Sequence, residues 1–442
     1  MWTVDSWQRA TIAQDVQYDD NEDLHRVLAR LHTLPPLISP HEITKLQAEL
    51  SEAQEGRSFV LQAGDCAERF KDCTPEIIVK QVCTLMRMQS VLAHDLKLPI
   101  VCIGRIAGQY AKPRSEPFES RDGITLPSFR GDIINSLEFS SEARRYDPAR
   151  LFEAYAHSAF TLNMVRNLLD EGLPDIDKPD TWNLAGMEND YNTKGYHHFA
   201  SRALDSARPA SAFSINKHRN YGLCYTSHEA LHLHYEQALT RAMPDDKWTN
   251  LGTHFPWLGL RTGMPEGAHM EYLRGISNPI AVKVGPNTTA AQLLYTIDIL
   301  NPSNSSGKLC LITRMGKSHI ARKLPPLLDA IKREGRHVLW MVDPMHGNTE
   351  NTASGYKTRQ FNRICSEIEI AIDLHQTAGT RLGGVHLEIS GEDVTECLGG
   401  AIGLCESDLP SYYRSAVDPR LNASQAVEMA FFLASRMRQE TR

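Results

Sequence analysis

The stretch FVLQAGDCAE, residues 59–68, contains a short apolar run that ends at a glycine and is followed at once by polar residues. A run of this length, bounded by turn residues and followed by the helical pattern of 77–96, is typical of a buried parallel strand and its crossover helix. In an arrangement of this kind, residues just beyond a strand lie at the edge of the sheet that carries function. The stretch therefore indicates an α/β fold and makes Cys66 a candidate for chemistry.

The same order of run, turn and helix recurs along the chain. Further apolar or β-branched runs lie at 99–106, 181–186, 222–227, 281–285, 309–316, 338–347 and 384–390. Two more helical patterns cover 149–172 and 318–335. About eight alternations favour a (β/α)8 TIM barrel over an open sheet. The run at 250–259 is a ninth candidate, which we interpret as a strand-like loop.

The alternation also suggests the domain organisation. Residues 1–57 combine helical periodicity with a Pro-rich break, which predicts an N-terminal helical extension. Residues 58–442 are the predicted catalytic barrel. Within it, the polar and His-rich stretch 187–221 interrupts the alternation of strands and helices, and we expect inserted helices there.

The composition limits the classes of partner. The chain has 442 residues, of which 41% are hydrophobic, and a net charge of -7, so nothing favours binding to nucleic acid or an anionic membrane. No basic start with an apolar core opens the sequence, and no apolar run approaches the roughly 18 residues that span a bilayer. Nine cysteines without a CxxC pair argue against a disulfide scaffold and a structural zinc module. We expect a cytoplasmic protein without nucleic-acid or membrane partners.

Two sets of polar residues follow the predicted strands. One set offers a thiolate, an imidazole and two carboxylates, from Cys66, His346, Glu388 and Asp418. This mixture suits a borderline divalent metal with a coordination position left open. A single strand-end cysteine is more often a small core residue, so the hypothesis depends on the whole set.

The second set is cationic and consists of Arg105, Lys112, Arg114, Arg261, Lys283 and Arg314. So many cations at one barrel mouth would repel each other unless an anion neutralised them. Guanidinium groups suit phosphate and carboxylate, which accept two parallel hydrogen bonds. The set therefore predicts an anionic substrate.

Two short motifs give competing interpretations. His228, Glu229 and His232 have the order H-E-x-x-H, which on a helix would place two imidazoles over a zinc ion, as in a peptidase. RMGKS at 314–318 resembles the end of a phosphate-binding loop, but position 311 is Leu where that motif needs glycine. We reject the phosphate-binding loop and keep the zinc peptidase as a remote alternative.

Several motifs resemble those of class II 3-deoxy-D-arabino-heptulosonate 7-phosphate (DAHP) synthases, which begin the shikimate pathway. They are GDCAE, RIAGQYAKPRS, FRGDIIN, TSHEAL, VKVGPN, RMG, DPMHGNT, HLEISGEDVTECLGG and DPRLN, and they run from about Phe59 to Arg438 in the order of the family. The resemblance implies a (β/α)8 barrel with an N-terminal extension and extra helices. It also implies condensation of phosphoenolpyruvate with erythrose 4-phosphate, with release of inorganic phosphate.

The resemblance implies roles for individual residues. The metal ligands would be Cys66, His346, Glu388 and Asp418, holding Mn²⁺ or Co²⁺, with Zn²⁺ or Fe²⁺ as alternatives. Phosphoenolpyruvate would lie against Arg105, Leu260, Arg261, Lys283 and Arg314. The aldose phosphate would meet Lys112, Arg114 and Ser115, and the catalytic residues would be Lys112, Lys283 and Glu229.

One segment departs from the family. Where the family usually shows GERTRQLDGAH, this chain has GLRTGMPEGAH at 259–269, with Leu260 and Gly263 in place of Glu and Arg. The alternative is therefore a secondary-metabolism paralogue, of the phenazine or aminoDAHP type, that uses the same or a modified aldose phosphate. By resemblance we also expect a homo-oligomer, a dimer or tetramer, and a chorismate mutase is a candidate partner.

Overall fold

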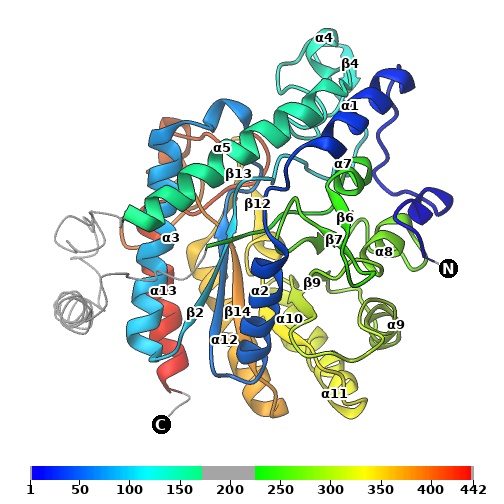
Figure 1. Ribbon diagram of the computed structural model, residues 1–442. Helices are drawn as coiled ribbons and strands as arrows, with labels where there is room; N and C mark the ends of the chain where they lie inside the picture. Colours follow the sequence, from blue (N-terminus) through cyan, green and yellow to red (C-terminus); the bar gives the residue numbers. More distant parts are fainter. Residues whose placement is uncertain (1, 172–223, 440–442) are drawn as a thin grey trace.

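Eight parallel strands form the centre of the computed structural model, which describes residues 2–171 and 224–439 (Figure 1). Along the sheet the order is β5-β2-β1-β14-β11-β10-β9-β8. The two end strands are joined by a parallel bridge between Glu229 and Trp257. Around the ring, the strands therefore follow one another in chain order, and the predicted (β/α)8 barrel is confirmed. The barrel strands are β1 Phe59–Gly64, β2 Ile100–Arg105, β5 Tyr225–Thr226, β8 Trp257–Leu258, β9 Ile280–Val284, β10 Leu309–Thr313, β11 Leu339–Val342 and β14 Leu382–Glu388.

The run at 250–259 differs from our interpretation as a loop. Its end is the barrel strand β8, and its start belongs to β7 Trp248–Asn250, which pairs with β6 Thr240–Ala242 in an outer hairpin. Only two residues of the run, Trp257 and Leu258, lie in the barrel ladder. The run at 181–186 and the expected insertion at 187–221 lie outside the described residues.

Helices lie to the left and right of the strands and above them in Figure 1. The helical pattern at 318–335 is divided into two helices at Pro325, because proline has no N–H to continue the hydrogen-bond ladder. The helices that follow the strands are α3 Pro75–Leu96, α4 Ser141–Arg144, α5 Ala149–Glu171, α7 Leu233–Ala238, α8 Ala268–Leu273, α9 Ala290–Leu300, α10 Lys317–Lys323, α11 Pro325–Arg333, α12 Phe361–Ala378 and α13 Ala423–Gln439. Two further hairpins, β3 Phe118–Arg121 with β4 Ile124–Pro127 and β12 Thr349–Asn351 with β13 Lys357–Arg359, extend the loops after β2 and β11.

Helix α2, Pro40–Gln54, closes the amino-terminal end of the barrel (Figure 1). It begins with a capping box between Ser39 and Glu42, which satisfies backbone N–H groups that no helical carbonyl can reach. Its apolar face is fully buried and shares one cluster with inward residues of the barrel strands. The residues of this face are Leu46, Leu50 and Ala53.

Helix α1, Asn21–Thr33, packs on the opposite end of the molecule against α5 and α7 (Figure 1). Leu24 and Leu31 are buried in a second cluster with Tyr110 and Leu151. The segment before it contains the short helix Ser6–Arg9, which packs against α8. The N-terminal residues thus contact both ends of the barrel.

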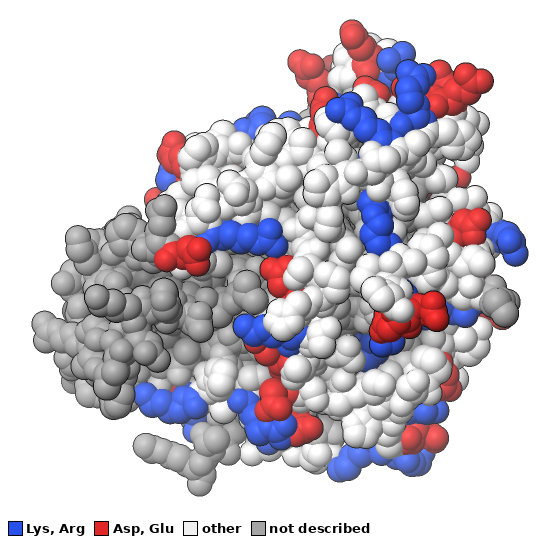
Figure 2. Space-filling model, in the orientation of Figure 1, with Lys and Arg blue, Asp and Glu red and all other residues white. Residues whose placement is uncertain are grey.

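The surface in Figure 2 mixes Lys and Arg with Asp and Glu, most densely over α4 and β4 at the top of the view. No disulfide joins the cysteines in the described parts of the chain. None of the helices in the described parts of the chain is long and apolar enough to cross a membrane.

Leu50→Ala is expected to lower the free energy of unfolding by about 2–5 kcal/mol, because it leaves a cavity at the closed end of the barrel. Urea unfolding followed by circular dichroism measures the change. Lys45→Ala, at an exposed position of the same helix, is the control and is expected to change stability by less than about 0.5 kcal/mol. An equally small effect of Leu50→Ala would contradict the role of α2 as the closure of the barrel.

Candidate active site

A cavity of about 210 Å³ opens at the carboxyl ends of the strands. Its wall brings together five of the six predicted cations, namely Arg105, Lys112, Arg261, Lys283 and Arg314. Glu229, Leu260, His346 and Asp418 line the same cavity. Positive charge gathered around so small a volume makes it a binding site for an anion of matching size.

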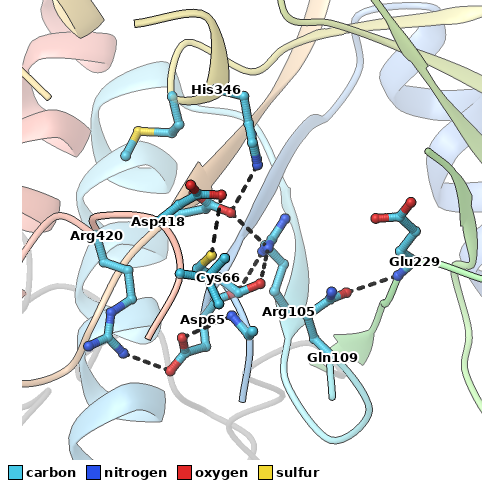
Figure 3. Close-up of polar contacts among 12 residues, drawn as sticks. Asp65, Cys66, Arg105, Gln109, Glu229, His346, Asp418 and Arg420 are labelled. Carbon is cyan, nitrogen blue, oxygen red and sulfur yellow. Dashed lines mark hydrogen bonds and ion pairs between the residues drawn. The ribbon is translucent and has the colours of Figure 1, made fainter. Parts of the chain in front are cut away.

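Three predicted metal ligands lie together beneath this cavity. One donor atom each from Cys66, Glu388 and Asp418 lies within 4.8 Å of the other two. The fourth, His346, places Nε2 3.1 Å from Glu388 Oε1. Figure 3 shows His346, Cys66 and Asp418 turned toward one another from separate loops. One thiol, one imidazole and two carboxylates at this spacing fit a divalent ion of the borderline class.

A close approach of two strands places Cys66 and Arg105 side by side. Gly64 ends β1 with φ +152°, and a Cβ there would lie 2.5 Å from the carbonyl oxygen of Arg105. Only glycine tolerates this contact. Beyond it, the guanidinium of Arg105 donates to the Asp65 and Cys66 carbonyl oxygens at 2.7 and 3.0 Å. The chain after β1 is therefore fixed by the residue that ends β2.

Lys112 lies among the ligand atoms. Its Nζ is 2.6 Å from Asp418 Oδ2, 3.0 Å from Cys66 Sγ and 3.9 Å from Glu388 Oε1. Burial alone would lower the pKa of Lys112, but the charge of Asp418 and the other two groups raises it overall. Burial and the charge of Glu388 raise the pKa of the Cys66 thiol to about 12. Lys112 thus remains charged and balances the carboxylates.

Glu388 is the most enclosed of the four predicted ligands and has no exposed surface. Arg105 binds its Oε1 at 3.0 Å and Arg359 its Oε2 at 2.7 Å. Despite burial, which acts in the opposite direction, His346 and Arg359 hold the pKa of Glu388 well below its usual value. Arg359 is a site residue that the sequence did not indicate, because it lies in the hairpin strand β13 and not at the end of a barrel strand.

Lys283 projects from β9 into the cavity and donates to Asp343 Oδ2 at 2.6 Å. The same oxygen lies 2.7 Å from His346 Nδ1, so Asp343 orients both side chains. Burial lowers the pKa of Lys283 to about 8, although Asp343 opposes the shift. Asp343 was also missed, although it lies in the DPMHGNT motif directly after β11.

Glu229 supplies an unpartnered carboxyl group to the cavity. Its backbone N–H donates to Gln109 Oε1 at 2.9 Å, while its buried Oε1 has no hydrogen-bond partner (Figure 3). Burial raises the pKa of Glu229. Trp257, which forms a parallel bridge with Glu229, also lines the cavity, and its ring lies 5.7 Å from Lys283 Nζ and 5.0 Å from Arg105 Cζ. A carboxyl group in this position can hold a water molecule or a proton.

The outer rim contains the remaining predicted residues. Arg261 is exposed and donates to Ser115 Oγ at 2.9 Å. Leu260 is 42% exposed and lies between this cavity and a second one of about 290 Å³ beside β9. Arg114 does not line the cavity, and its backbone is bound by Gln14.

The zinc-peptidase interpretation of residues 228–232 is wrong. Helix α7 begins only at Leu233, so the two histidines do not lie on consecutive helical turns. His228 Nε2 lies 2.7 Å from Glu236 Oε1, and His232 Nε2 lies 2.7 Å from the Tyr18 hydroxyl. Both imidazoles therefore belong to buried hydrogen-bond networks.

The chain is similar to known proteins over almost its whole length. The model of the class-II DAHP synthetase family matches residues 2–434. A Neurospora crassa protein named phospho-2-dehydro-3-deoxyheptonate aldolase is 40% identical over 458 residues, covering 99% of this chain and 95% of that protein. A Streptomyces coelicolor protein of the same name is 40% identical over 445 residues, covering 98% and 97%. A solved structure of that name from Francisella tularensis SCHU S4 matches with a TM-score of 0.46 and 14% identity, over 96% of this chain and 97% of that chain.

Lys112→Met is expected to tighten Mn²⁺ binding by about tenfold or more, because a cation bound to Cys66 and Asp418 would no longer compete with the ammonium group. Isothermal titration calorimetry measures the dissociation constant. Lys357→Met is the matched control, since Lys357 Nζ also lies near Asp418, at 3.4 Å, but the side chain is 46% exposed. Weaker Mn²⁺ binding in Lys112→Met than in the control would contradict the assignment of these ligands.

Proposed function

Because the chain belongs to the class-II DAHP synthetase family, we propose that it condenses phosphoenolpyruvate with erythrose 4-phosphate to give DAHP and inorganic phosphate. One observation carries the proposal: five cationic side chains line a single cavity directly above a Cys, His, Glu and Asp cluster. Two phosphates and a carboxylate require several cations, and an aldehyde becomes a better electrophile when a Lewis acid polarises its oxygen. The cationic cavity meets the first requirement, and the Cys, His, Glu and Asp cluster, as a metal site, meets the second.

Phosphoenolpyruvate is assigned to the inner part of the cavity. Lys283 and Arg314 end adjacent strands β9 and β10 and can meet its carboxylate and phosphate, with Arg261 at the rim. We expected Arg105 to bind phosphoenolpyruvate directly, but its contacts within the protein indicate a different role. All three of its nitrogens already bind groups of the protein, so it contributes charge and position more than free donors.

The divalent ion is assigned to Cys66, His346, Glu388 and Asp418. When bound, it would act as a Lewis acid on the aldehyde oxygen of the acceptor. Mn²⁺ or Co²⁺ is the proposed working ion, and Zn²⁺ or Fe²⁺ would also fit a set with one soft and three harder donors.

The protein's own residues position the reacting groups. Carbon 3 of phosphoenolpyruvate forms the new bond to the aldehyde carbon, water adds at carbon 2, and the bond from carbon 2 to the phosphate oxygen breaks. The water oxygen becomes the keto oxygen at carbon 2, and the two protons of the water go to the former aldehyde oxygen and to the departing phosphate. Lys283 stabilises the negative charge of phosphoenolpyruvate, and Glu229 Oε1 orients the attacking water. Holding both substrates in one enclosed cavity converts an encounter of two molecules into a step within one complex.

The identity of the aldose phosphate and the oligomeric state are separate questions from the reaction type. Leu260, at the rim, replaces a charged residue of the family, so a secondary-metabolism paralogue with a modified aldose phosphate stays the alternative. The predicted homo-oligomer and chorismate mutase partner likewise stay predictions.

Cys66→Ser is expected to lose more than about 100-fold of Mn²⁺-dependent turnover, because it removes a ligand of the proposed ion. Phosphate release from phosphoenolpyruvate, across a panel of aldose phosphates and their amino analogues, measures turnover and identifies the acceptor. Cys405→Ser, at an exposed position, is the control and should retain full activity. Normal turnover in Cys66→Ser would refute the site, and no phosphate release from the wild type with any acceptor would refute the activity.

The KM for phosphoenolpyruvate is expected to rise about tenfold between pH 7 and pH 9, because Lys283, with its pKa near 8, loses its charge over this interval. Steady-state kinetics at saturating aldose phosphate measure the profile. Lys283→Arg keeps the charge and should flatten it. A profile that is identical in the wild type and Lys283→Arg would exclude Lys283 as the titrating group.

A further inference from the structure

Gln14, in the N-terminal extension, holds the backbone of the predicted aldose-phosphate loop. Its Oε1 accepts from the Arg114 N–H at 2.8 Å, and its Nε2 donates to the Arg114 carbonyl at 3.0 Å. These are both hydrogen-bonding groups of the Arg114 peptide backbone. The backbone at Arg114 therefore cannot turn without breaking two bonds at once.

Gln14 is itself held in an uncommon conformation. Its φ of 61° lies in the left-handed region, which residues other than glycine seldom adopt. The buried guanidinium of Arg130 donates to the Gln14 carbonyl and, at 2.6 Å, to the Asp15 carbonyl. The carbonyl of Arg130 accepts from the Lys112 N–H at 2.8 Å. One residue thus joins the N-terminal segment to the start of the loop at 112–115.

The same segment is anchored a second time, four residues further along. The Tyr18 hydroxyl lies 2.7 Å from His232 Nε2, and both side chains are buried. His232 follows Glu229 on the segment after β5. Residues 14–18 therefore connect two loops that line the cavity, one through Lys112 and one through Glu229.

We propose that residues 14–18 form a strap that positions the loop 112–115 for the aldose phosphate, with Gln14 as the positioning residue. The inference rests on the proposed function, because it assigns this loop to that substrate. Ser115 in the loop accepts from Arg261, so a displaced Arg114 backbone would also disturb this rim contact. The described contacts of Lys283 do not include the strap, so the inner phosphoenolpyruvate contacts should be kept and only the Arg261 contact at the rim should weaken.

Gln14→Ala tests the strap, and Gln8→Ala is its matched control. Gln8 is an exposed glutamine of the same N-terminal segment whose Nε2 reaches only Gln237 Oε1, at 3.3 Å. In Gln14→Ala, the KM for erythrose 4-phosphate should rise about tenfold, as expected for the loss of two neutral hydrogen bonds. The KM for phosphoenolpyruvate should rise clearly less than the KM for erythrose 4-phosphate, because only the exposed rim contact of Arg261 is disturbed, and Gln8→Ala should match the wild type. Equal rises in both KM values would overturn the proposal, since they would indicate a general structural effect.

Hydrogen exchange at the Arg114 amide provides a test that does not need turnover. Gln14→Ala should accelerate exchange there by about tenfold or more, whereas Gln8→Ala should leave it unchanged. Unchanged exchange in Gln14→Ala would overturn the strap. Faster exchange in a protein whose wild type releases no phosphate would leave the strap in place and refute the proposed function instead.

Discussion

Glu388 is a carboxylate without access to solvent, and its charge can be kept there only if cations surround it. An unpaired buried charge costs several kcal/mol, whereas a charge with well-placed partners can be accommodated. Arg105, Arg359 and Lys112 place positive charge within 4 Å of its two oxygens, and His346 Nε2 lies 3.1 Å from Oε1. The arrangement of strands makes this possible. Gly64 of β1 pairs in register with Glu388 on one side and with Arg105 on the other, so three neighbouring strands bring the carboxylate and guanidinium into one layer.

Three other carboxylates, of which Glu367 and Glu396 are fully buried, fix the loops around this layer. Each accepts hydrogen bonds from backbone N–H groups of a loop that carries site residues. These bonds fix the loop without adding charge to the cavity. Glu68 binds the loop at 107–109, Glu367 the residues after β10 and the Asn348 amide, and Glu396 the residues near Asp418. Burial raises the pKa of Glu68 and of Glu367 to about 7. Because these carboxylates fix the loops that carry the site residues, the site keeps its geometry before any substrate binds.

Much of the fold and part of the site could be predicted from sequence pattern. Short apolar runs alternating with helices are enough to indicate a parallel barrel, because the period of each segment reports its local structure. The strand-end rule found Cys66, Lys283 and Glu388, since the ends of parallel strands meet at one edge. It could not find Arg359, which enters from a hairpin, and the run that contains β8 was interpreted as a loop. Nor could it show that the nitrogens of Arg105 are already bound, because such contacts depend on residues up to 283 positions away.

The central claim is that one charge-balanced cluster at the barrel mouth holds a divalent ion beneath an anion-binding cavity. Anomalous diffraction at the manganese edge, from crystals of the wild-type protein grown with Mn²⁺ and phosphoenolpyruvate, tests it most directly. The account predicts one peak within about 2.0–2.4 Å of donor atoms of Cys66, His346, Glu388 and Asp418, with the phosphate near Lys283 and Arg314. A peak bound elsewhere, with none at these four residues, would contradict it.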